Sequence, residues 1–418
     1  MRLGLGLAGG SSCLGLIAAL LVLPVAALAS PLRWSGEASA SIWSSDRKLN
    51  DDEAIAVSRA ESAVDWRPSE SVSLRAEGWA MSAPERLDGK RTSAGLKEMF
   101  AEARTLPCTP ALGKKLISWG KTDALNPTDQ LSPTNFRRLV AKDTSQREGV
   151  WGLHLNCAAG AGRVQAHLLD RFRFNDVPLA ERAGIEFQND KPRLRATKAL
   201  RYEAMGSSAD WSVSFIDGHD LNPTLAVRSV SAQGVLVGRD ATPMQMVGGD
   251  LAITHGKMVY RAEAAWVRYP GQMIGAHAQR RPYAYVVVQA EHGLGDRETV
   301  SVQAFGKQLR GELHASGNPL LEQLQFAQGL LGNELDHRSY GLTLRYARPL
   351  WDSRADMDVF VVYARPRNDW MLRSRVTYAL SDSLRISAGF DAFRGPAASY
   401  LGNLRANSLA FAELSATW

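Results

Sequence analysis

The chain has few cysteines and no long hydrophobic run after its N-terminal segment. Only three cysteines occur in 418 residues, and Cys13 lies in an N-terminal apolar stretch without the lipobox of a lipoprotein. No later stretch approaches eighteen apolar residues, so the sequence predicts no membrane-spanning helix. Nothing repeats at a period of 20–50 residues, which gives no support to a solenoid or propeller. No Pro/Ser-rich linker marks a second domain.

The N-terminal segment has the pattern of a secretory signal peptide. Arg2 is the only charged residue before Arg33, an apolar stretch covers residues 14–28, and Ala27 and Ala29 are the third and the first residue before the expected cleavage point. We expect residues 1–29 to be removed, because Pro24 and the small residues favour cleavage over an uncleaved anchor. The mature domain is then residues 30–418, and its net charge falls from +6 to +5 with the loss of Arg2.

The stretch "SWGKTDALNPTDQLSP" at 118–133 invites comparison with phosphate and metal loops. A nucleotide-binding loop needs a glycine where this chain has Lys115, and the nearest glycine, Gly113, is at the wrong spacing. A calcium loop needs ligands at intervals of two, whereas Asp123, Asn126 and Asp129 lie three apart. We therefore expect no cofactor and no metal here.

Apolar and charged residues alternate along many segments of the chain. "WMLRSRVTYAL" at 370–380 opposes apolar side chains to Arg373 and Arg375, and "SLAFAELSATW" at the C-terminus ends on Trp418. Period-two alternation with charges on one face fits a barrel in lipid around a wet lumen, although a soluble sandwich gives the same alternation. The terminal aromatic resembles the C-terminal signature of Gram-negative outer-membrane barrels, which the assembly machinery reads. This favours an all-β, up-and-down, transmembrane antiparallel barrel.

The alternation predicts about eighteen strands, or sixteen if the least regular segments, 96–104, 111–120 and 194–204, are not all strands. Short turns alternate with long loops along the chain, as expected for bacterial barrels with periplasmic termini. One long loop, 218–242, contains "GVLVG" and is expected to hold a small hairpin. The predicted strands are 32–43, 53–66, 71–81, 96–104, 111–120, 149–158, 162–173, 194–204, 209–217, 243–254, 258–268, 283–291, 298–309, 338–347, 356–364, 370–380, 383–394 and 407–418.

The same alternation places charges of both signs in the lumen. They cannot be buried dry, so they need water or one another, and a barrel about eighteen strands wide has room for a channel. Paired arginines and carboxylates would polarise water across the pore, or they are simply solvated wall residues. The overall positive charge favours anions weakly. The expected pore-lining residues are Arg163, Arg171, Arg261, Arg345, Arg373, Arg375, Arg385, Asp356, Asp358 and Asp391.

The opening stretch begins the third external loop, residues 121–148. In position and length this loop resembles the constriction loop of general porins, which folds into the barrel and narrows the pore. Two prolines and turn-forming Asx residues suit a shaped loop, although an ordinary surface loop remains the alternative. The residues expected at the constriction are Asp123, Asn126, Asp129, Arg137 and Arg138.

Three segments, "SWGKTDALNPTDQLSP", "DWSVSFIDGHDLNP" and "MVGGDLAITHGKMVYRAEAAW", resemble a porin-like family of proteobacterial outer-membrane proteins. The resemblance implies a barrel in the outer membrane without a particular substrate. We expect a passive channel for small polar or charged solutes, or an accessory barrel in lipid or envelope-polymer transport linked to an inner-membrane exporter. Expected partners are outer-membrane lipids, lipopolysaccharide, the barrel assembly machinery and the solutes; no nucleic acid is expected.

Two further groups of residues lead to expectations. His154, Asn156 and His167 could meet in the lumen, but no serine motif accompanies them, so we expect no enzyme. Cys108 and Cys157 lie at the periplasmic edge of neighbouring predicted strands. Because the periplasm is oxidising, a disulfide between them is favoured over two free thiols.

Overall fold

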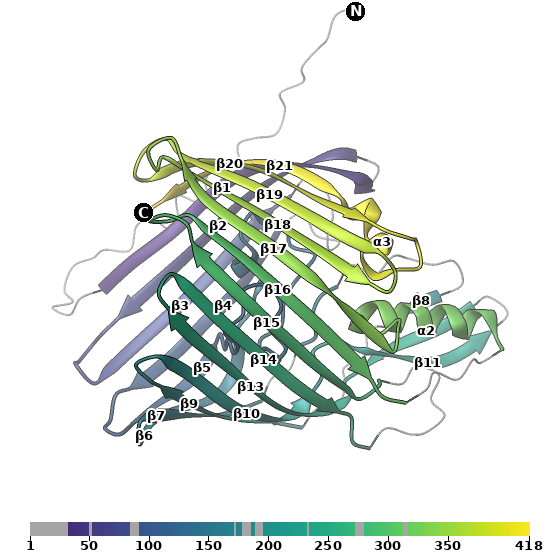
Figure 1. Cartoon of the computed structure of the whole chain (residues 1–418), viewed down its shortest axis with the longest axis horizontal. Coiled ribbons are helices and arrows are strands. Elements are labelled where there is room, and N and C mark those ends of the chain that lie inside the picture. Colours follow the sequence, from purple (N-terminus) through teal and green to yellow (C-terminus); the bar gives the residue numbers. More distant parts are fainter. Residues whose placement is uncertain are drawn as a thin grey trace, which may run out of the picture.

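The computed structural model describes residues 32–49, 52–83, 92–170, 173–177, 185–188, 195–231, 234–271, 280–311 and 317–418. The predicted signal peptide therefore lies outside the described residues. Eighteen antiparallel strands form one sheet, and its first strand, β1 (Leu32–Leu49), pairs with both β2 (Asp52–Trp66) and the last strand, β21 (Leu409–Thr417). The sheet is thereby closed into a barrel (Figure 1).

The remaining barrel strands follow in chain order, each beside its predecessor in the wall. They are β3 (Val72–Ser82), β4 (Thr92–Ala103), β5 (Cys108–Lys115), β6 (Val150–Ala159), β7 (Gly162–Leu169), β9 (Thr197–Met205), β10 (Ala209–His219), β13 (Pro243–His255), β14 (Met258–Arg268), β15 (Tyr283–Gly293), β16 (Thr299–Leu309), β17 (Arg338–Leu350), β18 (Ala355–Arg365), β19 (Asp369–Ala379) and β20 (Leu384–Arg394).

The eighteen predicted strands are confirmed, including the three least regular segments, so the alternative of sixteen is wrong. The largest boundary errors are in β1, which extends to Leu49 rather than to residue 43, and in β5, which ends at Lys115 rather than at residue 120. In β5 the chain changes course. After it the chain leaves the wall: the N–H of Leu116 donates to Glu98 Oε1 and the N–H of Ile117 donates to Ser132 Oγ. Side chains have replaced the neighbouring strand as partners of the backbone.

The outward face of the barrel carries exposed apolar side chains on every side. Ile42, Leu112, Val213, Leu342 and Leu414 are each between 45% and 67% exposed. Contiguous exposed apolar surface of this extent suits contact with lipid rather than water. None of the helices in the described part of the chain is long and apolar enough to cross a membrane.

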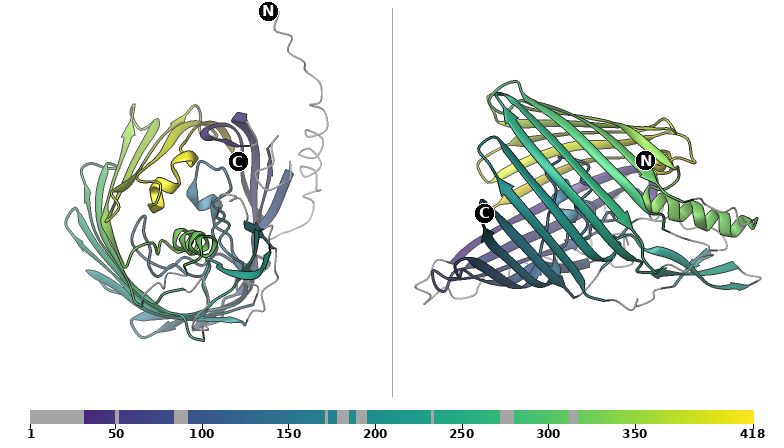
Figure 2. Two further views of the ribbon diagram at one scale, coloured as in Figure 1. Left: turned by 90° about the vertical axis from the view of Figure 1, so that its right-hand side faces the viewer. Right: turned by 60° about the horizontal axis from the view of Figure 1, so that its bottom comes forward.

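A small domain stands above the long-loop end of the barrel (Figures 1 and 2). The expected hairpin is confirmed as β11 (Thr224–Ser231) and β12 (Gly234–Asp240), to which β8 (Ile185–Phe187) adds in parallel. Helix α2 (Pro319–Gly332) contributes Leu324, Ala327 and Leu331 to the apolar cluster that these strands share. This helix is absent from the sequence prediction.

The lumen is not polar throughout, which the alternation rule did not predict. Inward-facing side chains in the outer half of β10 to β15, such as Ile216, Met244, Val267 and Tyr283, are buried. They pack with Ile117, Trp119 and Leu131, which come from the chain segment after β5. Part of the lumen is therefore a dry core formed between the wall and the third external loop.

Cys108 and Cys157 lie directly opposite each other on β5 and β6 and form a disulfide. The bridge joins the two strands at the short-turn end, where the sequence placed both cysteines. It therefore ties together the two strands that flank the third external loop, at the end opposite to that loop.

Candidate functional site

The third external loop crosses the lumen and attaches to two walls of the barrel. Its first part contributes Leu131, and the residues leading into it contribute Trp119, to the dry core against β6 to β16. Its second part places Leu139 and Ala141 against a separate cluster of Trp43 on β1, residues of β2, and Phe411 on β21. Attachments on two walls fix the loop across the barrel, and short helices of other loops lie beside it (Figure 2).

The segment "GKT" at 120–122 does hold an anion, but that anion is a side chain of the wall. The Glu263 carboxylate on β14 accepts hydrogen bonds from the N–H groups of Lys121, Thr122 and Thr128 and from both threonine hydroxyls, at 2.7–3.5 Å. Gly120 has φ +96, and an added Cβ would lie 2.7 Å from that carboxylate. The loop therefore wraps around Glu263, which sequence analysis missed because its partners lie about 140 residues away.

Two aspartates of the loop have separate partners. The N–H of Asp123 donates to Gln289 Oε1 at 3.1 Å, and Gln289 Nε2 donates to Asp123 Oδ2 at 2.6 Å. Asp129 pairs with Arg147 at 2.7 Å. Burial raises the pKa of the Asp129 carboxyl, and Arg147 acts in the opposite direction. These aspartates mainly hold the loop in shape.

Arg138 anchors the second part of the loop. Its guanidinium lies 3.9 Å from the ring centroid of Trp79 and pairs with Glu148 at 2.7 Å. Burial lowers the pKa of Arg138, and Glu148 opposes that effect. From the facing wall Arg375 Nη1 donates to the carbonyl of Ala141. This last contact directly joins the loop to the arginine-bearing strand β19.

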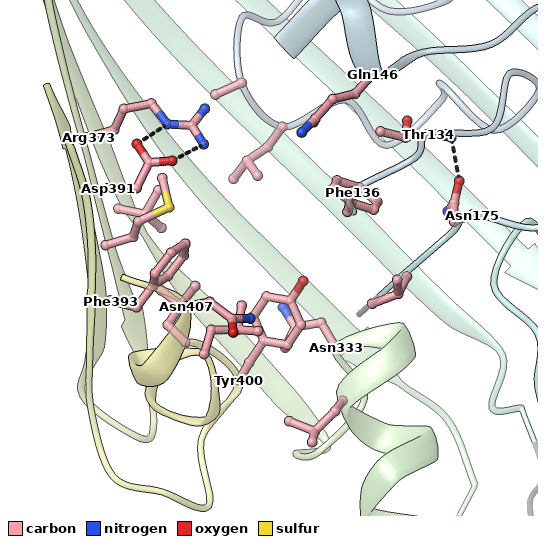
Figure 3. Close-up of a pocket in the computed structure, with 18 of the residues that line it drawn as sticks. Thr134, Phe136, Gln146, Asn175, Asn333, Arg373, Asp391, Phe393, Tyr400 and Asn407 are labelled. Carbon is pink, nitrogen blue, oxygen red and sulfur yellow. Dashed lines mark hydrogen bonds and ion pairs between the residues drawn. The ribbon is translucent and has the colours of Figure 1, made fainter. Parts of the chain in front are cut away.

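A cavity of about 1290 Å³ remains between the loop and the wall formed by β16 to β21. Figure 3 shows four contributors to its lining: Phe136 of the crossing loop, Asn333 after α2, Tyr400 of helix α3 (Tyr400–Asn403), and the Arg373–Asp391 pair on the wall. Two further loops contribute Asn175 and Leu221 to the lining, and all charged lining residues on the barrel strands come from β17 to β20.

Six of the ten expected pore-lining residues line this cavity: Arg345, Arg373, Arg375, Asp356, Asp358 and Asp391. Arg373 binds Asp391 through two hydrogen bonds of 2.9 and 3.0 Å, and Arg345 binds Asp358 at 2.6 Å. Of the expected loop residues, Asp123, Asn126, Asp129 and Arg138 line it as well. The wall therefore presents fixed ion pairs rather than isolated charges.

The other expected residues lie elsewhere. Arg163 pairs with Glu203 at 2.6 Å and Arg261 with Glu291 at 2.9 Å, both on the wall outside the cavity lining. Arg385 lies at the short-turn end of β20, and Arg137 is in the loop 3.9 Å from Asp176; neither lines the cavity. Arg171 lies outside the described residues.

The wall of the cavity also carries a group of apolar side chains, which sequence analysis missed. Phe360 lies directly opposite Arg373, and Val362, Met371 and Phe393 occupy the next inward positions of β18 to β20 toward the long loops. They face a helix and a loop that carry further apolar groups, including Leu330, Leu335 and Leu404. The sequence did contain an indication of this group, because apolar residues on both faces of a strand indicate that both faces contact apolar groups.

The two histidines considered for catalysis do meet, with 3.0 Å between their Nδ1 atoms. His154 Nε2 lies 3.4 Å from the carbonyl of Gly113, and Trp119 packs beside His167 with ring centroids 5.8 Å apart. The pair thus contacts the base of the crossing loop. Among the described residues, no group of three or more His, Cys, Asp or Glu side chains is arranged to hold a metal ion.

The Glu263 contact allows a direct test of the loop attachment. In the variant Glu263→Gln the amide NH2 would face donors, leaving buried N–H groups unpaired at a cost of about 1–3 kcal/mol each. We expect faster hydrogen–deuterium exchange in the peptide covering residues 119–131 of the folded protein. Glu102→Gln is the matched control, because Glu102 pairs with Lys115 on the wall. Equal exchange in both variants would show that Glu263 does not hold the loop.

No protein-family model matches the chain, and no curated protein is similar to it in sequence. Its fold is similar to solved structures. Acinetobacter baumannii OccAB1 aligns with a TM-score of 0.58 at 10% identity, over 93% of this chain and 96% of that one. Pseudomonas aeruginosa OccK5 (OpdH) aligns at 0.55 and 12%, over 93% and 97%. P. aeruginosa OpdK with vanillate aligns at 0.56 and 9%, over 93% and 98%. The chain therefore has the fold of outer-membrane porins.

Proposed function

We propose that this outer-membrane barrel is a passive channel for small polar or charged solutes, which pass between the crossing loop and the wall of β17 to β21. The observation that carries the proposal is the cavity of about 1290 Å³ inside the barrel, lined by the ion pairs Arg373–Asp391 and Arg345–Asp358. Ordered charges of both signs replace part of the hydration of a polar solute. The fold, shared with porins, supports this reading.

A weak preference for anions is part of the proposal. Eight cationic side chains and seven carboxylates line the cavity, so its net charge is small and positive. The structure of OpdK with vanillate gives a precedent for a small organic anion on a barrel of this fold. Because most of the charges are paired, the selectivity should be modest rather than absolute.

The test is single-channel recording in planar bilayers under a salt gradient. We expect discrete conductance steps and a reversal potential on the anion-selective side. Replacing both loop aspartates, Asp123→Asn with Asp129→Asn, should move the reversal potential further toward anions, because two negative charges leave the lumen and Arg147 loses its partner. The double change Asp296→Asn with Asp382→Asn, both in exposed short turns, is the charge-matched control. An assembled barrel without conductance would refute the channel.

One observation favours a second function, an accessory role in lipid or envelope-polymer transport. The apolar side chains on the cavity wall, Phe360, Met371 and Phe393, suit a solute with a hydrocarbon part better than a simple ion. The bilayer recording distinguishes the two. A barrel that assembles, does not conduct and co-purifies with lipid in its lumen would support the accessory role.

A further inference from the structure

Two histidines face each other across neighbouring strands on the lumen side of the wall. His154 on β6 and His167 on β7 are direct partners in the register of this antiparallel pair, and the two strands lie side by side in Figure 1. Their Nδ1 atoms are 3.0 Å apart, and the ring planes are inclined at 65°. Counted around the barrel, β6 and β7 lie across from β18 and β19, and neither histidine lines the cavity. The pair is therefore a separate feature of the lumen.

The separation of the two nitrogens suits a shared metal ion. A transition metal binds an imidazole nitrogen at about 2.0–2.1 Å, so two such ligands at an angle of roughly 90–110° are about 2.8–3.4 Å apart. The observed distance of 3.0 Å lies inside this range. A hydrogen bond between the two nitrogens gives the same distance, and an ion would take the place of its single proton. Metal binding thus requires no movement of either strand.

The second nitrogen of His154 has a partner that favours metal binding through Nδ1. This Nε2 atom lies 3.4 Å from the carbonyl oxygen of Gly113 on β5, which can only accept a hydrogen bond. A proton on Nε2 leaves the Nδ1 lone pair free, and metal-binding histidines are commonly oriented by such a carbonyl. When an ion replaces the shared proton, that proton moves to Nε2 of His167, which has no other hydrogen-bond partner among the described atoms. Each neutral ring keeps one proton, so binding at neutral pH releases none.

The strands that carry the pair hold it rigidly. The disulfide between Cys108 and Cys157 joins β5 to β6 three residues from His154, and β7 pairs along its whole length with β6 and β9. His154 is only 3% exposed, and Trp119 packs beside His167 with ring centroids 5.8 Å apart. Ligands that are fixed before the ion arrives lose little conformational freedom on binding.

Amide oxygens occupy the next inward position on the same two strands. Asn156 and Gln165 are direct partners, one side-chain repeat closer to the short turn between β6 and β7. Gln165 Oε1 accepts a hydrogen bond from Trp119 Nε1 at 3.1 Å, whereas Asn156 is exposed to the lumen. An ion that enters from the short-turn end therefore meets oxygen ligands before it reaches the histidines.

The ligand set selects the class of metal. Neutral imidazoles suit Cu²⁺, Ni²⁺ and Zn²⁺, and Cu²⁺ binds most tightly in the general affinity order of these ions. Among the described residues no third His, Cys, Asp or Glu side chain joins the pair, so Mg²⁺ and Ca²⁺ lack the carboxylate ligands that they prefer. Lys115 acts on both histidines through its charge, but it is paired with Glu102 at 3.1 Å. This ion pair weakens the repulsion of a bound metal.

We propose that His154 and His167 bind one divalent transition-metal ion of this class, Cu²⁺ most tightly, through their Nδ1 atoms. Water molecules would fill the remaining coordination positions. The ion would join β6 to β7 beside Trp119, where the chain enters the crossing loop. Because the cavity lies on the other side of the lumen, this binding is independent of the proposed channel function.

The test uses folded protein in detergent, without a histidine tag, titrated with Cu²⁺ and followed by electron paramagnetic resonance. Below one equivalent of Cu²⁺, wild type should show splitting from two imidazole nitrogens. His154→Gln and His167→Gln should each lose this pattern and bind Cu²⁺ at least about tenfold more weakly, because loss of even an orienting partner of a metal ligand costs roughly 10- to 100-fold. His255→Gln, which removes an exposed histidine beside a short turn, is the matched control and should behave like wild type.

A measurement on wild type alone decides the matter if the substitutions impair assembly. A large excess of Zn²⁺ should abolish the two-nitrogen Cu²⁺ spectrum, and the same excess of Mg²⁺ should leave it unchanged. A wild-type spectrum with fewer than two imidazole nitrogens, or one that Mg²⁺ abolishes as readily as Zn²⁺, would overturn the proposal. So would equal Cu²⁺ affinities of the control and of both assembled variants, because the ion would then be bound elsewhere.

Discussion

Shortening the third external loop between Leu125 and Thr144 is expected to raise the single-channel conductance roughly twofold or more, because the segment that narrows the lumen is removed. The deleted residues include both attachments described above: Leu131 of the dry core and Leu139 of the cluster near Phe411. None of them belongs to a barrel strand, so the inter-strand hydrogen bonds remain. Liposome swelling should show a larger exclusion limit.

The deletion also exposes inward-facing apolar residues such as Ile216 and Met244 to water, so some loss of thermal stability is expected. Unchanged heat modifiability on gels shows whether the barrel still assembles. Replacing residues 126–143 by a Gly/Ser segment of equal length tests whether the fixed shape of the loop, and not only its length, narrows the lumen. The conductance of this variant should lie between those of wild type and the deletion variant. Wild-type conductance in an assembled deletion variant would place the loop outside the conducting path.

Replacing the last residue, Trp418→Asp, is expected to reduce the folded protein in the outer-membrane fraction roughly tenfold, because a charge would replace an interfacial aromatic. Trp418 packs against Trp34 with ring centroids 5.8 Å apart, and it exchanges two backbone hydrogen bonds with Gly36. An added Cβ at Gly36 would lie 2.3 Å from the Trp418 ring. The terminal residue is thus seated at the seam where β1 meets β21.

Thr417→Asp is the matched control, since it adds the same charge one residue away on the inward face of β21. The measurement is the heat-modifiable band in the outer-membrane fraction, compared with total protein. Normal levels for Thr417→Asp and low levels for Trp418→Asp are expected. If both variants assemble like wild type, the C-terminal aromatic has no part in assembly.

Strand positions could be predicted from the sequence because lipid imposes one rule on every strand. Alternation such as that of "WMLRSRVTYAL" depends only on residues two positions apart, so it can be recognised without knowledge of the fold. The rule failed at residues 116–120, where alternation continues although the chain has left the wall for the lumen. It also missed α2, although Asn318 caps this helix through the N–H of Leu320 and Pro319 follows as its first residue. The start of this helix could therefore have been predicted from the sequence.

The site was less predictable than the wall. The sequence indicates which residues face inward, and Arg373 and Asp391 accordingly line the cavity. It does not indicate which inward residues the loop covers. Ile216 and Glu263 are inward residues on strands, and both are buried by a segment about 100 or more positions earlier in the chain. Contacts over such separations depend on the path of one loop, and no local pattern encodes that path.

The two attachments of the crossing loop have a consequence for the order of assembly. One attachment involves strands in the middle of the chain, whereas the other contains Trp43 of β1 and Phe411 of β21, the first and last strands. The second attachment is complete only when these terminal strands have met. The second part of the loop can therefore be fully seated only once the ring has closed, and a barrel that closes with its loop outside would leave an apolar patch beside its own seam in contact with water.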